Sequence, residues 1–198
     1  MSVDEVIQLE AIRDEFPGLT KAIGAYLYEA ATVILDECRH RPGCTLEILS
    51  EPQRKISVHW RETVISQQTK AAWNDRDRAT EAAAECVVLL LCLVESGDCA
   101  VERARKRTGI DYWIRKEMHK GESDTEVFQW CCRIGISGIF SGTLQDMKRR
   151  LRRKIKQAEQ SADSGFPAWV VVVEFAHLRI LEDHSMTTLP DHSTEETP

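Results

Sequence analysis

The sequence contains no uncharged apolar run that is long enough to cross a membrane. The longest such run, Cys86 to Val94, has nine residues, whereas a transmembrane helix needs about 20. The first residues are acidic and amphipathic rather than basic and then apolar, so we expect no secretion signal. We therefore predict a cytoplasmic location with no membrane partner.

The sequence also lacks several motifs that would identify an enzyme or a metal site. No Cys-x-x-Cys pair occurs among the seven cysteines, which argues against a zinc site. The phosphate-loop motif GxxxxGK[ST], the nucleophile motif GxSxG and the zinc motif HExxH are absent as well. We expect most cysteines to be small buried side chains rather than members of a disulfide framework.

Length and composition indicate a folded domain rather than a disordered chain. The 198 residues are 42% hydrophobic and 29% charged, which is sufficient for a real core. The net charge of −6 argues against a general nucleic-acid coat protein. However, residues 148–156 read KRRLRRKIK and hold seven cations, so the distribution of charge is more informative than its sum.

Hydrophobic periodicity divides the chain into helices and strands. Helices are expected over residues 3–15, 20–38, 62–73, 75–95 and 141–160, with Thr20 and Ser141 as N-caps. Strands are expected over residues 44–50, 54–60, 99–105, 110–116, 127–140, 168–175 and, at a sheet edge, 177–181. Residues 119–126 form an expected polar loop.

This pattern predicts an α/β (α+β) fold with a mixed central sheet and flanking helices on both faces. Its closing strand–helix–strand unit is a right-handed crossover by default. We expect an N-terminal helical and hairpin elaboration packed on the core (1–73), an α/β core (74–182) and a disordered tail (183–198).

The order α, β, β, β, α, β over residues 75–175 resembles that of the PD-(D/E)XK nuclease superfamily. The resemblance implies a restriction-endonuclease-like core. Such a core carries an acid on the first helix, an aspartate on the second strand and a Glu-x-Lys triplet on the third. The carboxylates of this site bind divalent metal, which activates water, and the lysine orients the nucleophile.

Three acidic residues match positions of that family site. Glu81 and Glu85 lie one turn apart on the first expected helix, and Asp111 lies in the second expected strand. The resemblance implies that Asp111 and Glu85 bind Mg²⁺ if the protein is active. The catalytic set that it implies is Asp111, Glu85, Glu81 and Lys156.

The third strand departs from the family pattern. Its matching positions are Gly135 and Ser137, so the Glu-x-Lys triplet is missing and the site is expected to be degenerate or inactive. Lys154 or Lys156 could replace the lysine, and Glu174 is the nearest candidate for the missing carboxylate. The acidic residues also have ordinary interpretations, as the solvent face of a helix, an outward strand residue or a salt-bridged surface residue.

The basic segment is the strongest physical signal. As a helix it would dock on the sheet through a stripe formed by Leu144, Met147, Leu151 and Ile155. Its exposed face would carry about six charges along roughly 14 Å and bind phosphates in a salt-dependent, sequence-neutral way. The predicted nucleic-acid-binding residues are Lys148, Arg149, Arg150, Arg152, Arg153, Lys154 and Lys156, together with Arg105 and Arg107 from a second basic cluster.

Two functional hypotheses follow. The first is a nuclease-like, nucleic-acid-binding protein that works inside a DNA-processing or anti-phage defence complex. The second is a non-catalytic interaction subunit, in a larger complex or a homo-oligomer, with no nucleic-acid role. The second draws on the missing triplet and the net charge of −6.

Overall fold

The protein is described here from a computed structural model. The structure describes residues 5–14, 16–62, 64–96, 99–116 and 130–185. The expected polar loop at 119–126 lies outside these ranges, and so do residues 186–198 of the expected tail.

Eight strands in the described ranges form a single sheet. They are β1 (Val6–Gln8), β2 (Cys44–Ile48), β3 (Arg54–His59), β4 (Cys99–Arg103), β5 (Tyr112–Lys116), β6 (Trp130–Ile139), β7 (Ala168–Glu174) and β8 (Arg179–Ser185). The α-helices are α1 (Lys21–Glu37), α2 (Gln67–Ala72), α3 (Arg76–Ser96) and α4 (Leu144–Ala158). Short 3₁₀ segments cover Leu9–Ile12 and Glu159–Ser164.

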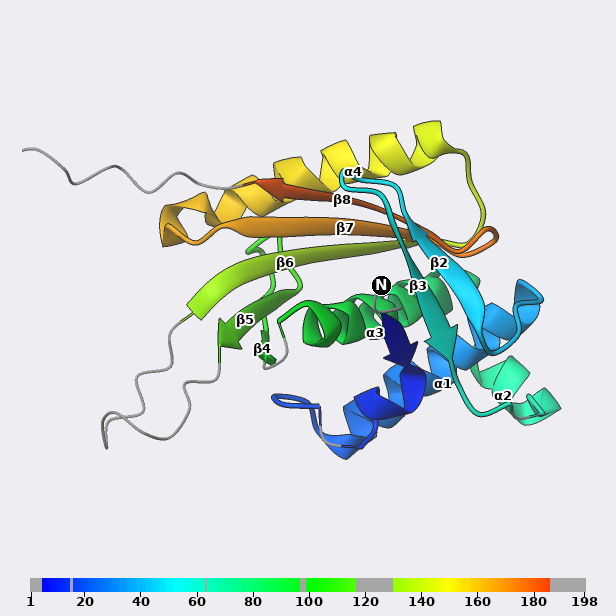
Figure 1. Ribbon diagram of the computed structural model, residues 1–198. Helices are drawn as coiled ribbons and strands as arrows, with labels where there is room; N and C mark the ends of the chain where they lie inside the picture. Colours follow the sequence, from blue (N-terminus) through cyan, green and yellow to red (C-terminus); the bar gives the residue numbers. More distant parts are fainter. Residues whose placement is uncertain (1–4, 15, 63, 97–98, 117–129, 186–198) are drawn as a thin grey trace, which may run out of the picture.

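The sheet is mixed and has the order β1-β3-β2-β8-β7-β6-β5-β4. Neighbours are parallel at β1–β3, β2–β8 and β6–β7, and antiparallel elsewhere. Helix α4 covers one face, whereas α1 and α3 lie on the other (Figure 1). The predicted mixed α/β fold is confirmed, and the predicted order α, β, β, β, α, β is found from α3 to β7.

The centre of the sheet is β7, in which all seven residues are buried. Alternate members of the run Val170–Val173 belong to two separate cores, one on each face. One core contains α1 and α3, and the other contains Met147 and Leu151 of α4. The prediction of a strand buried on both faces is therefore confirmed, because side chains alternate between faces along a strand.

Two contacts fix the helices that flank β6. A Cβ atom at Gly138 would lie 2.4 Å from the carbonyl oxygen of Thr80, so α3 crosses β6 at backbone contact distance. Arg133 of β6 is buried and donates to the carbonyl oxygens of Ala158 (3.0 Å) and Phe166 (2.8 Å). The Ala158 bond ties the C-terminal end of α4 to the sheet.

The N-terminal region differs from the predicted elaboration. Residues expected as a helix over 3–15 instead form β1 and a 3₁₀ turn, in which Ile7, Leu9 and Ile12 are buried. The hairpin of β2 and β3 was predicted at nearly its observed bounds. It extends the central sheet, however, because β2 pairs in parallel with β8.

Three further predictions need correction. Strand β8 was expected at an edge, but it lies between β2 and β7 and continues to Ser185, because β2 pairs with its outer side. Only Gln67–Ala72 of the expected helix over 62–73 is α-helical. The N-cap of α4 is Thr143 rather than Ser141, because Thr143 and Asp146 form a reciprocal capping box. No helix in the described ranges is long and apolar enough to span a membrane.

Candidate functional site

The site begins where β5 separates from β6. Register pairing starts at Tyr112 with Ile134, and the N–H of Asp111 still donates to the carbonyl oxygen of Ile134 (2.8 Å). Beyond that point no strand of the described ranges pairs with the Ile136 N–H on this side of β6, and the N–H donates instead to Oδ2 of Asp111 (2.7 Å). The Asp111 carboxylate therefore replaces a missing strand partner.

Glu81 of α3 acts in the same way one step further along β6. Its Oε2 accepts from the Gly138 N–H (2.9 Å), and its Oε1 accepts from the Ser137 hydroxyl (3.1 Å). Burial raises the pKa of Glu81, while these two hydrogen bonds act in the opposite direction. Alternate N–H groups of a strand point to the same edge, so two carboxylates stabilise consecutive open positions of β6.

Lys154 crosses the cleft from α4. Its Nζ lies 2.8 Å from Oδ2 of Asp111, and the two side chains are 16% and 25% exposed. A Cβ atom at Gly135 would lie 3.4 Å from two carbons of Lys154, so the lysine stem runs directly over this glycine. Of the two lysines that could replace the missing triplet lysine, Lys154 therefore meets Asp111, whereas Lys156 is exposed and does not line the cleft.

Glu85 faces a different partner. Its two oxygens accept from Nη1 (2.6 Å) and Nη2 (3.0 Å) of Arg103, and Oε2 also accepts from the hydroxyl of Tyr112 (2.6 Å). Tyr112 is fully buried, and its burial together with the Glu85 charge raises its pKa. Such a bidentate arginine–carboxylate pair is among the stronger ion pairs.

These carboxylates do not fit the Mg²⁺ site that the family resemblance implies. Every oxygen of Glu81 and Glu85 already accepts a hydrogen bond. Among the carboxylate oxygens of Glu81, Glu85 and Asp111, only Oδ1 of Asp111 accepts from no donor within the described residues. No cluster of three or more His, Cys, Asp or Glu residues suited to a metal ion occurs among the described residues. In this arrangement the two implied metal ligands already pair with cations of the protein: Asp111 pairs with Lys154, and Glu85 pairs with Arg103.

Two adjoining hollows open around Asp111. The first, which we call the central cleft, has a volume of about 310 Å³, and its charged lining residues are Glu81, Glu85, Asp111, Arg150, Arg153 and Lys154. The second, which we call the turn pocket, has a volume of about 330 Å³, and its charged lining residues are Arg103, Arg105, Lys106, Arg107, Asp111 and Lys154. The two hollows adjoin, because both are lined by Asp111, Lys154 and Gln157, and together we call them the groove.

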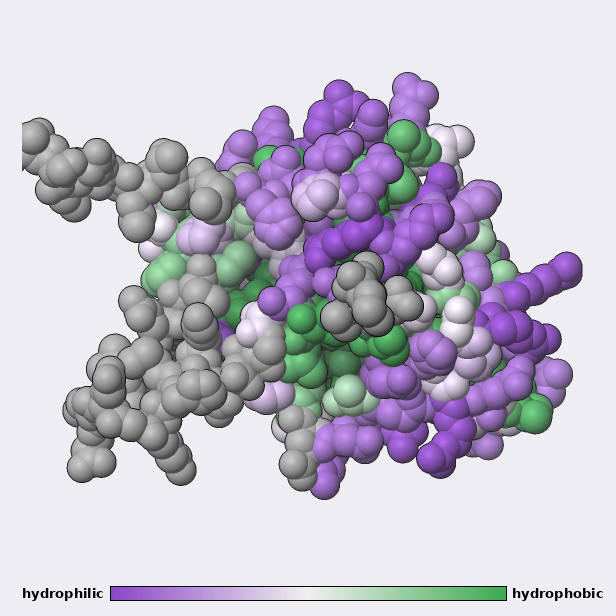
Figure 2. Space-filling model, viewed as in Figure 1, coloured by the Kyte–Doolittle hydropathy of each residue, from purple (hydrophilic) through white to green (hydrophobic). Residues whose placement is uncertain are grey.

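Helix α4 presents most of its predicted cations to solvent, but Arg150 and Lys154 are half-buried and pair with Glu81 and Asp111. Met147 and Leu151 are buried against the sheet, Ile155 is half-buried, and Leu144 is 40% exposed. Five of the predicted nucleic-acid-binding residues are exposed on this helix, namely Lys148, Arg149, Arg152, Arg153 and Lys156. Figure 2 shows mainly hydrophilic residues along the border of the molecule where α4 runs.

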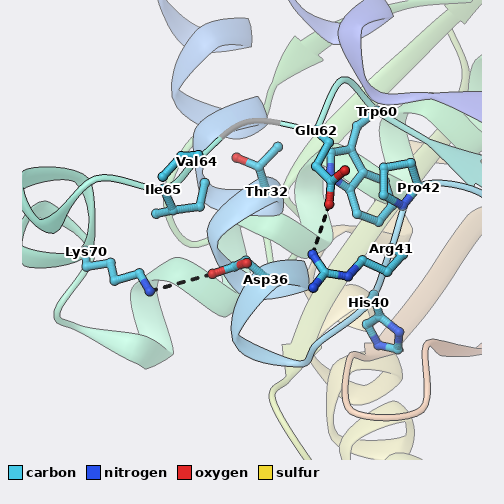
Figure 3. A pocket seen from close by; sticks show the side chains of 10 residues that line it. All are labelled: Thr32, Asp36, His40, Arg41, Pro42, Trp60, Glu62, Val64, Ile65 and Lys70. Atoms are coloured by element: carbon cyan, nitrogen blue, oxygen red, sulfur yellow. Dashed lines mark hydrogen bonds and ion pairs between the residues drawn. The ribbon is translucent and has the colours of Figure 1, made fainter.

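Glu174, considered as a substitute carboxylate, lies away from the groove. It is fully buried at the end of β7, where it accepts from the Arg179 guanidinium (3.0 Å) and the Gly142 N–H (3.3 Å). A larger hollow of about 530 Å³ opens elsewhere, between the end of α1 and the segment after β3 (Figure 3). Ion pairs Arg41–Glu62 and Lys70–Asp36 lie along it.

Sequence reasoning located most of this groove but not its internal pairing. The role of Arg103 as partner of Glu85 was missed, although its register position opposite Tyr112 follows once the β4–β5 hairpin is recognised. Lys106, which lies between the predicted binding residues Arg105 and Arg107, also lines the turn pocket. No sequence signal indicates that Asp111 and Glu81 hold backbone groups of β6.

The chain was compared with protein-family models, with curated proteins and with solved structures, and no match was found in any of the three.

Proposed function

We propose that this protein binds the sugar–phosphate backbone of nucleic acid in the groove between α4 and the turn that joins β4 to β5. One observation carries the proposal: cations from two basic segments that are distant in the sequence, 103–107 and 148–156, line two adjoining hollows, with Arg150, Arg153 and Lys154 contributed by the second segment. The α3-to-β7 order and the family resemblance support a nuclease-like core. We extend from that resemblance the further proposal that the protein serves a DNA-processing or anti-phage complex.

Several cations beside the groove are free to contact phosphates. No ion pair within the described residues engages Arg105, Lys106, Arg107 or Arg153. Phosphates that contact such side chains release counterions, so affinity falls steeply as salt increases. The overall charge of −6 does not oppose this binding, because electrostatic interactions beyond about 10 Å are screened at 0.1 M salt.

The groove has the features of a sequence-neutral site. No aromatic side chain belongs to the described lining of either hollow. Proteins that recognise unpaired bases stack them on aromatic rings, whereas contacts to phosphates position the backbone without reading sequence. We therefore infer that charge and shape, rather than base identity, govern the interaction.

The test is a titration of labelled DNA and RNA duplexes between roughly 50 and 200 mM salt. Each phosphate contact contributes about 0.9 to the slope of log affinity against log salt, so a steep slope is expected. The matched control is Lys21→Gln/Arg61→Gln, which removes two exposed cations outside the groove lining and should leave the slope unchanged. Absence of binding at the lowest salt would favour the protein-interaction hypothesis.

A separate assay addresses cleavage. We propose that the site has no metal-dependent activity in this arrangement, because Asp111, Glu81 and Glu85 are occupied by hydrogen bonds and ion pairs within the protein. The native chain and Asp111→Ala are incubated with DNA and RNA in Mg²⁺ or Mn²⁺, and both are expected to leave the substrate intact. Cleavage by the native chain that Asp111→Ala abolishes would restore the active-nuclease hypothesis and require the ion pairs to open.

A further inference from the structure

The two halves of the groove differ in charge. The central cleft is lined by three cations (Arg150, Arg153 and Lys154) and three carboxylates (Glu81, Glu85 and Asp111), so its lining is neutral. The turn pocket is lined by five cations (Arg103, Arg105, Lys106, Arg107 and Lys154) and one carboxylate (Asp111). A phosphate is therefore attracted to the turn pocket and receives little net attraction from the central cleft.

Pairing within the groove sharpens this difference. Lys154 is held by Asp111, and Arg103 is held by Glu85. The three consecutive cations at 105–107 are exposed and have no ion-pair partner among the described residues. An incoming phosphate can engage these three without first breaking a contact inside the protein.

The turn that carries these cations packs closely against α4 and the core. A Cβ atom at Gly109 would lie 1.7 Å from the carbonyl oxygen of Gln157, so the turn touches the backbone of α4. The hydroxyl of Thr108 donates to the carbonyl oxygen of Arg105 (2.8 Å), and Ile110 is buried in the core beneath α4. Because these contacts already hold the turn in one conformation before a ligand binds, little conformational freedom remains to be lost on binding, which favours affinity.

Arg107 has an unusual backbone conformation. Its φ of 77° lies in the left-handed region, which glycine and asparagine adopt far more readily than arginine. Residues held in such conformations cluster at functional sites. The side chain of Arg107 makes no ion pair within the described residues that would offset this strain.

We propose that the turn pocket, through Arg105, Lys106 and Arg107, is the principal phosphodiester-binding site of the groove, and that the nuclease-like central cleft contributes little. This inference rests on the proposed function and assigns its phosphate contacts to one half of the groove. The bound backbone lies beside the carboxylate centre rather than across it.

Two double variants of equal charge change test the assignment. Arg105→Gln/Arg107→Gly removes two cations from the turn pocket, and Arg150→Gln/Arg153→Gln removes two from the central cleft. Binding of a labelled DNA duplex is measured over a salt series. The turn variant should lower the salt slope by about 1.8 and weaken binding on the order of 50-fold at roughly 0.1 M salt, because each contact contributes about 0.9. The cleft variant should retain most of the native slope and affinity.

Further variants separate lost contacts from lost folding. Glycine suits the left-handed conformation at position 107, so Arg107→Gly should melt no lower than the native chain while binding more weakly. Arg105→Lys/Arg107→Lys keeps both charges and should bind nearly as the native chain does. An equal loss in the two double variants, or a greater loss in the cleft variant, overturns the assignment but leaves the proposed function intact. Failure of the native chain to bind overturns both.

Discussion

The ammonium group of Lys154 lies 2.8 Å from the Oδ2 atom of Asp111, and the same oxygen accepts the N–H of Ile136. One oxygen thus joins helix α4 to the open edge of β6. This ion pair holds the basic helix over the sheet. It also neutralises the positive charge of Lys154 within the cleft. The geometry assigns Asp111 a structural role that is independent of any catalysis.

The first prediction concerns that structural role. Asp111→Ala leaves the Ile136 N–H and Lys154 without their acceptor, whereas Asp111→Asn retains an oxygen for the N–H. We expect Asp111→Ala to lower the free energy of unfolding by about 1–3 kcal/mol, and Asp111→Asn to lower it by less. Denaturant unfolding of both variants measures the difference. The control is Asp163→Ala, at an exposed position, which should change little; equal losses at Asn and Ala would contradict the backbone role.

The second prediction compares two glycines of β6. A Cβ atom at Gly135 meets Lys154 and Val170 at ordinary contact distances of 3.4 Å or more, whereas one at Gly138 falls 2.4 Å from the oxygen of Thr80. Gly135→Ala should therefore change stability by less than about 1 kcal/mol. Gly138→Ala should lose about 1–3 kcal/mol or more, because α3 must move. Thermal unfolding of the pair decides, and a stable Gly138→Ala variant would show that α3 does not approach so closely.

The sequence predicted best where one physical signal dominates. The run Val170–Val173 and the alternating strands of the β2–β3 hairpin were recognised because burial imposes a clear pattern. Thr20 was predicted as an N-cap, and its hydroxyl accepts from the Ile23 N–H. These features depend on residues that are near one another in the chain.

Features that depend on distant partners were predicted less well. Whether β8 is an edge or an interior strand depends on β2, more than 100 residues away, which contributes only two register pairs. The short strand β1 has apolar residues at spacings that also suit a helix, and its pairing with β3 decides between them. In the site, Asp111 and the basic helix were brought together by the expected topology. The neutralisation of Glu85 by Arg103 was not predicted, because it depends on side-chain geometry.

The third prediction concerns pH. His184 stacks on Trp169 (ring centroids 5.3 Å apart), and its interaction with Glu182 raises the pKa of the imidazole above its usual 6.5. A raised imidazole pKa adds stability that is fully present below pH 6.5 and disappears as pH rises through the folded-state pKa. His184→Gln should therefore destabilise the protein more at pH 5.5 to 6 than at pH 8.5, by under about 1 kcal/mol because the side chain is 55% exposed.

Unfolding at several pH values, followed by tryptophan fluorescence, measures this effect. In a Glu182→Gln background the extra loss at low pH should shrink, because the carboxylate that raises the pKa of His184 most is gone and only the weaker effect of Glu95 remains. A pH-independent effect of His184→Gln in the native background would show that stacking alone accounts for its contribution.

The fourth prediction is a gain of nucleic-acid affinity. The carboxylate of Glu85 forms an ion pair with the guanidinium of Arg103, and Arg103 lines the turn pocket. Glu85→Gln removes the carboxylate charge, so Arg103, which also donates to the Tyr112 hydroxyl (2.7 Å), carries an unneutralised charge that can attract a phosphate. We expect the salt slope to increase by up to about 0.9 and affinity to rise by up to about eightfold at roughly 0.1 M salt.

The matched control for this prediction is Glu47→Gln. It makes the same change in net charge and frees a cation as well, because Glu47 pairs with Lys55 (2.8 Å) in the β2–β3 hairpin. That hairpin lies toward the opposite end of the sheet from β4 and β5. At about 0.1 M salt, electrostatic interactions are screened over about 10 Å, so the charge of Lys55 should not attract a phosphate bound in the turn pocket. Equal gains in the two variants would mean that net charge governs binding; a gain confined to Glu85→Gln would place the phosphate beside Arg103.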